Sequence, residues 1–131
     1  MSLIQVVSVA MGGAVGAVAR FSVAVMIEQK STTLFPWGTF TVNAVGCLVL
    51  GALFEMGTWI TIGPELRLAL TVGVLGAFTT FSTFALETLN LFRDREWLWA
   101  TANLTGNLLV GLLACLIGVW LARVGGKLFA G

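Results

Sequence analysis

The sequence predicts an all-α membrane protein in which each chain crosses the bilayer with four transmembrane helices. Of its 131 residues, 58% are hydrophobic and 10% are charged, whereas a soluble domain carries about 25% charged residues. Four segments are apolar and long enough to cross the ~30 Å hydrocarbon layer at ~1.5 Å per helical residue. Tryptophans stand near the expected ends of these segments, where such side chains prefer the membrane interface.

The first span is expected at residues 3–27. No charged side chain precedes Arg20. The run lacks the basic start of a cleaved signal peptide and is too long for one, so we expect it to be retained. Gly12 and Gly16 are four residues apart and share one helical face, which favours close contact with a neighbouring helix. Together with the glycines of the later spans, this pattern favours an oligomer with interlocked helices.

The remaining spans are expected at residues 37–59, 67–92 and 97–123, and the connections between them are short. No linker or low-complexity segment interrupts this pattern. The whole chain, residues 1–131, is therefore predicted to be a single four-helix transmembrane domain.

The Lys and Arg residues show almost no preference for one side of the membrane. With four spans, three of them fall on the side of the termini, three fall on the opposite side, and Arg20 lies near the latter. A protein of fixed orientation has a clear Lys/Arg excess on its cytoplasmic side. We therefore hypothesise that the chain inserts in both orientations and forms an antiparallel, dual-topology homodimer.

The most informative segment is 76–84 in the third span, which contains four hydroxyl side chains and three phenylalanines. Hydroxyls are costly in hydrocarbon unless they face a pore, an ion or another helix. Gly73 and Gly76 precede Thr79, and glycine weakens a helix interior. One interpretation is a helix broken near the middle of the membrane, whose free carbonyls at Gly76 and Thr79 would coordinate a hard cation such as Na⁺. The other is a continuous helix whose Thr hydroxyls bond to the preceding turn.

Phe81 and Phe84 are three residues apart and hence neighbours on one helical face, with Ser82 and Thr83 between them. Aromatic rings are positive at their edges, so two rings presented edge-on can hold a small anion while they exclude bulk water. The alternative is ordinary packing or lipid contact. The dense interleaving of rings with hydroxyl donors favours the anion site.

Amide side chains occur inside the second and fourth spans. Asn43 follows Thr39 by four residues, and Asn103 and Asn107 are also four residues apart. An amide at such a depth faces protein or water rather than lipid. The Asn43 NH₂ group can donate to an anion, and the asparagines of the fourth span can extend a polar track along the bundle interior. The alternative is that these amides hold the helices together.

Two charged side chains at the ends of apolar runs complete the candidates. Arg20 can snorkel to the interface or can make a pore mouth attractive to anions. Glu87 lies three residues after Phe84 on the same face. It is either an interfacial or arginine-paired carboxylate or an ion-exit gate.

The composition also excludes several classes of function. The chain has no His and few carboxylates, and it contains no nucleophile–base pair or catalytic motif, so we do not expect an enzyme. The formal charge of +1 gives no reason to expect a nucleic-acid partner. Cys47 and Cys115 lie inside apolar runs and are interpreted as small buried hydrophobic residues.

The residues described above resemble the Fluc (CrcB) family of fluoride channels across nearly the whole chain. The matching segments are Gly13–Arg20, Pro36–Asn43 and Gly73–Phe84, of which the Thr-Thr-Phe-Ser-Thr-Phe run is the most specific. The resemblance implies a dual-topology antiparallel homodimer with two fluoride pathways. It also implies a central structural Na⁺ ion, held by backbone carbonyls of the broken third helix in both subunits, which fall on Gly76 and Thr79.

The residue pattern and the resemblance together give the expected fluoride pathway. Its residues are Arg20, Thr39, Asn43, Phe81, Ser82, Thr83, Phe84, Glu87 and Asn107. Phe81 and Phe84 match the paired phenylalanines of the family, and Asn43 matches its pathway asparagine. One departure concerns the fourth span, where the family often has Tyr or Ser and this chain has Asn103 and Asn107.

The expected function is a fluoride-selective channel that passively exports F⁻ across the cytoplasmic (inner) membrane of a prokaryote and so lowers cytoplasmic fluoride. HF enters from acidic surroundings and dissociates inside, and an inside-negative potential then drives F⁻ out with about 2.3 kcal/mol per 100 mV. Two alternatives stay open. A small proton-coupled multidrug exporter needs a carboxylate within the membrane, usually in its first helix, and residues 1–27 contain none. The second alternative is a non-transporting membrane assembly subunit.

Overall fold

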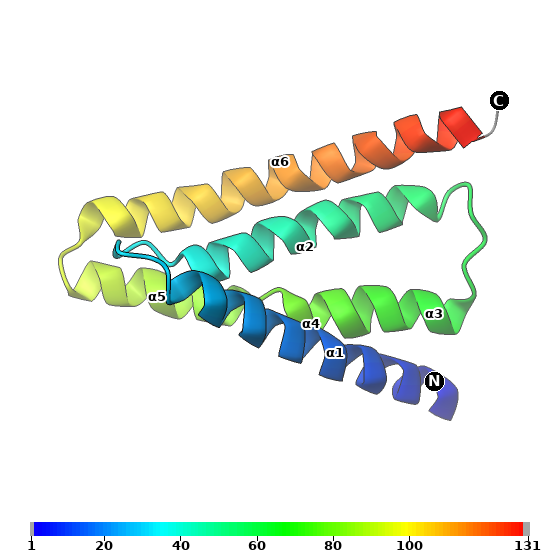
Figure 1. Ribbon diagram of the computed structural model, residues 1–131, viewed down its shortest axis with the longest axis horizontal. Helices are drawn as coiled ribbons and strands as arrows, with labels where there is room; N and C mark the ends of the chain where they lie inside the picture. The colour runs from blue at the N-terminus through cyan, green and yellow to red at the C-terminus, as the bar shows by residue number, and fades with distance from the viewer. Residues whose placement is uncertain (1, 130–131) are drawn as a thin grey trace.

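The computed structural model describes residues 2–129, which form helices joined by short connections, with no β-strand in that range (Figure 1). The first two helices are α1 (Leu3–Glu28) and α2 (Trp37–Met56), and the last is α6 (Trp97–Phe129). Between α2 and α6 the chain forms a segmented rod, here called the third rod. Its segments are α3 (Pro64–Leu68), the π-helical η1 (Ala69–Leu75), α4 (Gly76–Phe78) and α5 (Phe81–Arg93).

The prediction of four long apolar helices is confirmed. The stretches that are long and apolar enough to cross a membrane are Leu3–Glu28, Trp37–Met56, Pro64–Arg93 and Trp97–Leu128. They run alternately in opposite directions, so that both described ends of the chain lie at one end of the molecule (Figure 1). Many large apolar side chains on these helices are exposed. Apolar helices with so little polar surface are typical of membrane spans.

The third rod begins at Pro64 rather than at residue 67, and the ends of α2 and α6 also differ from the expected spans. α2 ends at Met56 rather than at residue 59, because the chain turns there and Thr58 satisfies a carbonyl of the last turn. The Thr58 hydroxyl donates to the Glu55 carbonyl at 2.7 Å and its N–H to the same carbonyl at 3.0 Å. Such bonds complete a helix end. α6 continues past residue 123 to Phe129, since that segment contains no proline to end the helix.

α2 packs along α6 at a distance that only glycine permits. A Cβ atom on Gly118 of α6 would lie 2.0 Å from the Leu48 carbonyl oxygen, and one on Gly51 of α2 would lie 2.2 Å from the Cys115 carbonyl oxygen. The two helix backbones therefore touch. Cys47 and Cys115 are free and partly buried, so they are less enclosed than predicted because the four helices are too few to surround them.

α1 packs against η1 through the glycine pair noted in the sequence. A Cβ atom on Gly12 would lie 2.3 Å from the Ala69 carbonyl oxygen, and one on Gly16 would lie 2.1 Å from the Val74 carbonyl oxygen. The close helix contact of this pair is thus made within one chain. An oligomer with interlocked helices stays a prediction.

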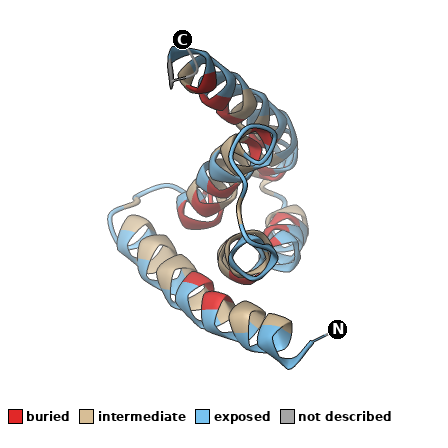
Figure 2. Ribbon diagram, turned by 90° about the vertical axis from the view of Figure 1, so that its right-hand side faces the viewer, coloured by how far each residue is buried: buried red, intermediate tan, exposed pale blue. Residues whose placement is uncertain are grey.

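Few side chains are completely buried. Figure 2 shows buried residues on the inner sides of the helices and only a short buried patch on α1, which consists of Gly12 and Gly16. Val42 of α2 and Asn103 of α6 have no exposed surface. A buried amide requires hydrogen-bonding partners, and those of Asn103 lead to the candidate site.

Candidate functional site

The third rod is interrupted at Thr79 and Thr80, whose backbones are extended. Thr79 has φ −85° and ψ 158°, and Thr80 has φ −150° and ψ 116°. The Thr79 N–H still donates to the Leu75 carbonyl at 3.0 Å. The Thr80 hydroxyl accepts the Thr83 N–H at 3.2 Å and so caps the start of α5. That this interruption lies near the middle of a bilayer stays a prediction.

The extended pair deprives several backbone carbonyls, those of Gly76 and Thr79 among them, of their helical donors, because in a continuous α-helix each N–H bonds to the carbonyl four residues earlier. The Thr80 N–H donates to Asn43 Oδ1 at 2.8 Å instead of to the Gly76 carbonyl. The Thr83 N–H donates to the Thr80 hydroxyl instead of to the Thr79 carbonyl. The Gly76 and Thr79 carbonyls, which were the predicted Na⁺ ligands, are therefore not bonded within the helix.

Two side chains from other helices hold the extended pair. Asn43 of α2 accepts the Thr80 N–H, and its Nδ2 atom donates to the Thr80 carbonyl at 3.1 Å and to Asn107 Oδ1 at 3.0 Å. From α1, the Arg20 Nη1 atom donates to the Thr79 carbonyl at 3.3 Å. The Arg20 guanidinium thus contacts the interruption itself, an arrangement that we did not predict.

Phe81 and Phe84 are neighbours, as their spacing predicts. Their ring centroids lie 5.5 Å apart with an interplanar angle of 62°. Their burial differs, because Phe81 is 75% exposed and Phe84 is 5% exposed. Ser82 and Thr83 are also exposed. The Thr83 hydroxyl accepts the proton of the Thr80 hydroxyl at 3.0 Å, so its own proton is free to bond to another acceptor.

The predicted pathway residues line two different grooves. The first, of about 290 Å³, is here called the amide groove, and its lining includes Asn43, Gly76, Thr79, Thr80, Phe81, Phe84 and Asn107. The second, of about 440 Å³, is called the carboxylate groove, and its lining includes Glu28, Thr39, Thr83, Glu87 and Asp94. Arg20 and Ser82 line neither groove. The structure therefore brings most of the predicted residues together, but in two groups.

In the carboxylate groove, Glu87 bonds to a hydroxyl group. Its Oε1 atom accepts the Thr39 hydroxyl proton at 2.7 Å, and its buried Oε2 atom has no hydrogen-bond partner within residues 2–129. Glu28 lies in the same groove, and its Oε2 atom accepts the Gly38 N–H at 3.0 Å. No arginine of the described chain pairs with Glu87, and its role as an ion-exit gate stays a prediction.

Asn103 and Asn107 of α6 connect the amide groove to α5. The Asn107 Nδ2 atom donates to Asn103 Oδ1 at 2.8 Å, and the Asn103 Nδ2 atom donates to the Thr88 hydroxyl oxygen at 2.9 Å. The Thr88 hydroxyl donates in turn to the Phe84 carbonyl at 2.8 Å. With the bond from Asn43 to Asn107, these contacts form a continuous chain of hydrogen bonds across α2, α6 and α5, here called the amide relay.

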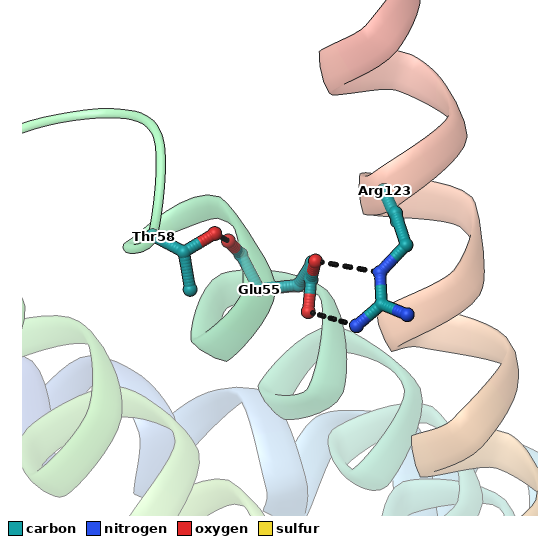
Figure 3. Close-up of polar contacts among 3 residues, drawn as sticks. All are labelled: Glu55, Thr58 and Arg123. Atoms are coloured by element: carbon teal, nitrogen blue, oxygen red, sulfur yellow. Dashed lines mark hydrogen bonds and ion pairs between the residues drawn. The ribbon is translucent and has the colours of Figure 1, made fainter.

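We did not predict the ion pair that joins α2 to α6 at the other end of the molecule. The Arg123 Nε atom donates to Glu55 Oε1 at 2.9 Å and its Nη2 atom donates to Oε2 at 3.1 Å (Figure 3). Glu55 is 9% exposed. The sequence contained a clue to this pair. Glu55 and Arg123 carry opposite charges near the ends of the second and fourth spans, and these ends lie on the same side of the membrane in a four-span chain.

Comparison with known proteins places these features in a family. Residues 7–119 match the CrcB-like protein, Camphor Resistance (CrcB) family. The chain belongs to this family. The matched range includes the interruption at Thr79 and Thr80, the amide groove and the amide relay. The resemblance inferred from the residues is confirmed.

Relatives within the family are similar along almost their whole length. The chain is 43% identical to the fluoride-specific ion channel FluC of Magnetococcus marinus over 121 residues, which are 92% of this chain and 98% of that protein. It is 40% identical to the FluC protein of Chloroflexus aurantiacus over 120 residues, 91% of this chain and 95% of the relative. It is 37% identical to that of Phocaeicola vulgatus over 113 residues, 86% of this chain and 93% of the relative.

Proposed function

We propose that this chain is a fluoride-specific ion channel. The observation that carries the proposal is the identity of 37–43% to fluoride-specific ion channels, over at least 86% of this chain and 93% of each relative. Such coverage extends to all four apolar helices rather than to a single motif. Ion conduction is not enzymatic, in agreement with the exclusion of an enzyme from the sequence.

The first turn of α5, between the two grooves, supplies groups that suit fluoride. The ion is small and strongly hydrated, so a channel must replace its lost water with close donors while it binds the ion weakly enough to release it. The exposed hydroxyls of Ser82 and Thr83 can donate to F⁻, and the edges of the Phe81 and Phe84 rings present a weak positive potential. None of these groups carries a full positive charge that would trap the anion.

We place the fluoride pathway along the first turns of α5, between the two grooves. Thr83 lines the carboxylate groove and Phe84 lines the amide groove, so one helix connects them. Thr39 and Glu87 then belong to one end of the pathway, and Asn43 and Asn107 to the other. Arg20, which reaches the Thr79 carbonyl, adds a positive potential that attracts anions to this region.

The interruption also fits a structural Na⁺ site. Backbone carbonyls released from a broken membrane helix are ligands that Na⁺ accepts, and the Gly76 and Thr79 carbonyls lack their helical donors here. Gly76 is exposed on the surface of the single chain, where a second copy can approach it. Because Arg20 already donates to the Thr79 carbonyl, a bound Na⁺ ion would either share this carbonyl oxygen with Arg20 or displace the Arg20 guanidinium from it.

We further propose that two chains assemble antiparallel as a dual-topology homodimer in the inner membrane of a prokaryote. The even distribution of Lys and Arg residues supports insertion in both orientations. In this arrangement F⁻ leaves the cell passively along an inside-negative potential.

The test is fluoride efflux from proteoliposomes loaded with F⁻. Purified protein is expected to release the trapped F⁻ within seconds of adding a K⁺ ionophore. The ionophore lets K⁺ leave together with F⁻, so that no membrane potential builds up against the efflux. Release of Cl⁻ should be far slower. Protein-free liposomes and liposomes with an unrelated four-helix membrane protein are the controls. If the reconstituted protein retains F⁻, or passes Cl⁻ equally well, the proposed function is wrong.

A further inference from the structure

The amide relay starts and ends on backbone groups whose hydrogen-bonding polarity cannot change. At one end, the Thr80 N–H donates to Asn43 Oδ1 at 2.8 Å. At the other end, the Phe84 carbonyl accepts the Thr88 hydroxyl at 2.8 Å. Both ends belong to α5 or to the residue before it. The three amides between them come from α2 and α6, so the relay ties the start of α5 to two other helices.

These fixed ends determine the orientation of every amide in the relay. The Asn43 oxygen must face the Thr80 N–H, so its NH₂ group faces the Asn107 oxygen at 3.0 Å. The Asn107 NH₂ group then faces the Asn103 oxygen at 2.8 Å. Thr88 donates its single proton to a carbonyl and can therefore only accept from the Asn103 NH₂ group. Each amide thus has one orientation that satisfies its neighbours.

Asn103 is the member of the relay that no ion can reach without separation of the helices. It is 0% exposed, and it lines neither the amide groove nor the carboxylate groove. Loss of its side chain would remove the acceptor of one Asn107 NH₂ bond and the donor to the Thr88 hydroxyl oxygen. Asn107 would keep its bonds with Asn43 and with the Asn103 backbone carbonyl, and Thr88 would keep its bond to the Phe84 carbonyl, but the connection between the two would be broken in a buried setting where lost hydrogen bonds are costly.

We propose that Asn103 is a positioning residue of the channel. It fixes Asn107, and through Asn107 it fixes the Asn43 amide that holds Thr80 extended, while Thr88 holds the turn that carries Phe84. The inference rests on the proposed function, because the geometry that Asn103 maintains is that of the fluoride pathway. It assigns control of fluoride flux to a side chain that never contacts the ion.

Two variants break the relay at different points, and a third is a matched control. Asn103→Leu removes the central amide and keeps the branching of the side chain, and Thr88→Val replaces only the hydroxyl at the far end by a methyl group. Thr105→Val makes the same change on an exposed face of α6, where the hydroxyl bonds only to the Thr101 carbonyl of its own helix. All three are reconstituted at equal amounts after size-exclusion chromatography confirms the native assembly.

Fluoride efflux is measured together with the side-chain amide NMR signals of ¹⁵N-asparagine-labelled protein in lipid nanodiscs. The chain has four asparagines, so the signals of Asn43 and Asn107 can be assigned by substitution. We expect Asn103→Leu and Thr88→Val each to lower flux by roughly tenfold or more and to shift the Asn43 and Asn107 signals. The double variant is expected to be no slower than Asn103→Leu alone, since both changes break one coupled network. Thr105→Val should change neither readout.

The inference is overturned if folded Asn103→Leu conducts like the unaltered protein, or if its flux falls while the Asn43 signal stays in place. It is also overturned if the two losses multiply in the double variant. If Asn103→Leu fails to assemble, the milder Thr88→Val variant tests the inference through fluoride flux and the position of the Asn43 amide signal. If the unaltered protein moves no F⁻, the proposed function fails, and the NMR signals alone then decide whether Asn103 positions Asn43.

Discussion

The Asn43 side chain and the Thr80 backbone form a reciprocal pair of hydrogen bonds. Asn43 Oδ1 accepts the Thr80 N–H at 2.8 Å, and Asn43 Nδ2 donates to the Thr80 carbonyl at 3.1 Å. An extended residue between two helical segments lacks helical partners on both sides, and in an apolar medium each unsatisfied group costs several kcal/mol. The Asn43 amide therefore bonds to both backbone groups of Thr80, as a neighbouring β-strand would. These two bonds stabilise the interruption of the third rod.

The first prediction concerns the charge and donors of Asn43. Asn43→Asp removes both donor bonds, to the Thr80 carbonyl and to Asn107, and places a negative charge beside the proposed anion path. We expect fluoride flux to fall by at least about tenfold. Gln29→Glu, an amide-to-acid change at an exposed position after α1, is the control and should conduct normally. A fully active Asn43→Asp channel would remove Asn43 from the pathway.

The second prediction separates the two rings of the phenylalanine pair. Phe81→Ile and Phe84→Ile should each suppress fluoride flux, because each removes an aromatic edge from the pathway. Only Phe84→Ile should also lower the free energy of unfolding, by about 1 kcal/mol, because Phe84 is packed and Phe81 is exposed. Phe21→Ile, at an exposed position of α1, is the control. Flux that stays unchanged in both variants would exclude a role of the rings in conduction.

The third prediction concerns the ion pair of Glu55 and Arg123. Arg123→Gln should lower the thermal unfolding midpoint more than Glu55→Gln. The first change leaves the Glu55 side chain, which is 12% exposed, without its partner, whereas the second leaves an arginine side chain that is 60% exposed and can reach the interface. Arg67→Gln, at an exposed position, should leave the midpoint unchanged. Equal midpoints for Arg123→Gln and the unaltered protein would show that the pair contributes nothing to stability.

The fourth prediction tests the close approach of α2 and α6. Gly118→Ala should lower the free energy of unfolding by roughly 1–3 kcal/mol, because the new Cβ would lie 2.0 Å from the Leu48 carbonyl oxygen. Gly125→Ala is the matched control in the same helix, where nothing lies within 4 Å of a new Cβ. It should be neutral or stabilising by up to about 1 kcal/mol, since alanine favours helix. Unfolding in mixed detergent micelles measures both, and equal effects of the two substitutions would contradict the close packing.

The fifth prediction concerns Na⁺. If the Gly76 and Thr79 carbonyls bind a structural ion, protein purified and reconstituted in K⁺ alone should conduct F⁻ much more slowly than protein prepared in Na⁺. Addition of Na⁺ should restore the rate without a matching change in Cl⁻ leakage. Full fluoride flux in protein that has never been exposed to Na⁺ after extraction would argue against the site.

Local spacing predicted only the features that follow from a helix's own geometry. Asn103 and Asn107 share one helical face because they are four residues apart, and the structure joins them through a hydrogen bond of 2.8 Å. Phe81 and Phe84, three residues apart, meet for the same reason. Residue spacing does not predict that Phe84 is buried while Phe81 is exposed, because burial depends on which neighbouring helix covers each face.

The amino-acid sequence by itself determined that the chain has four apolar helices, since helix length and hydropathy depend on consecutive residues. It also determined the family, because the Thr-Thr-Phe-Ser-Thr-Phe run and its neighbouring motifs are local patterns. Only the tertiary structure decided that Asn43 bonds to Thr80, that Arg20 bonds to the Thr79 carbonyl, and that the predicted residues divide between two grooves. These contacts join positions far apart in the chain, and the close packing of glycine-bearing helices sets which of them meet.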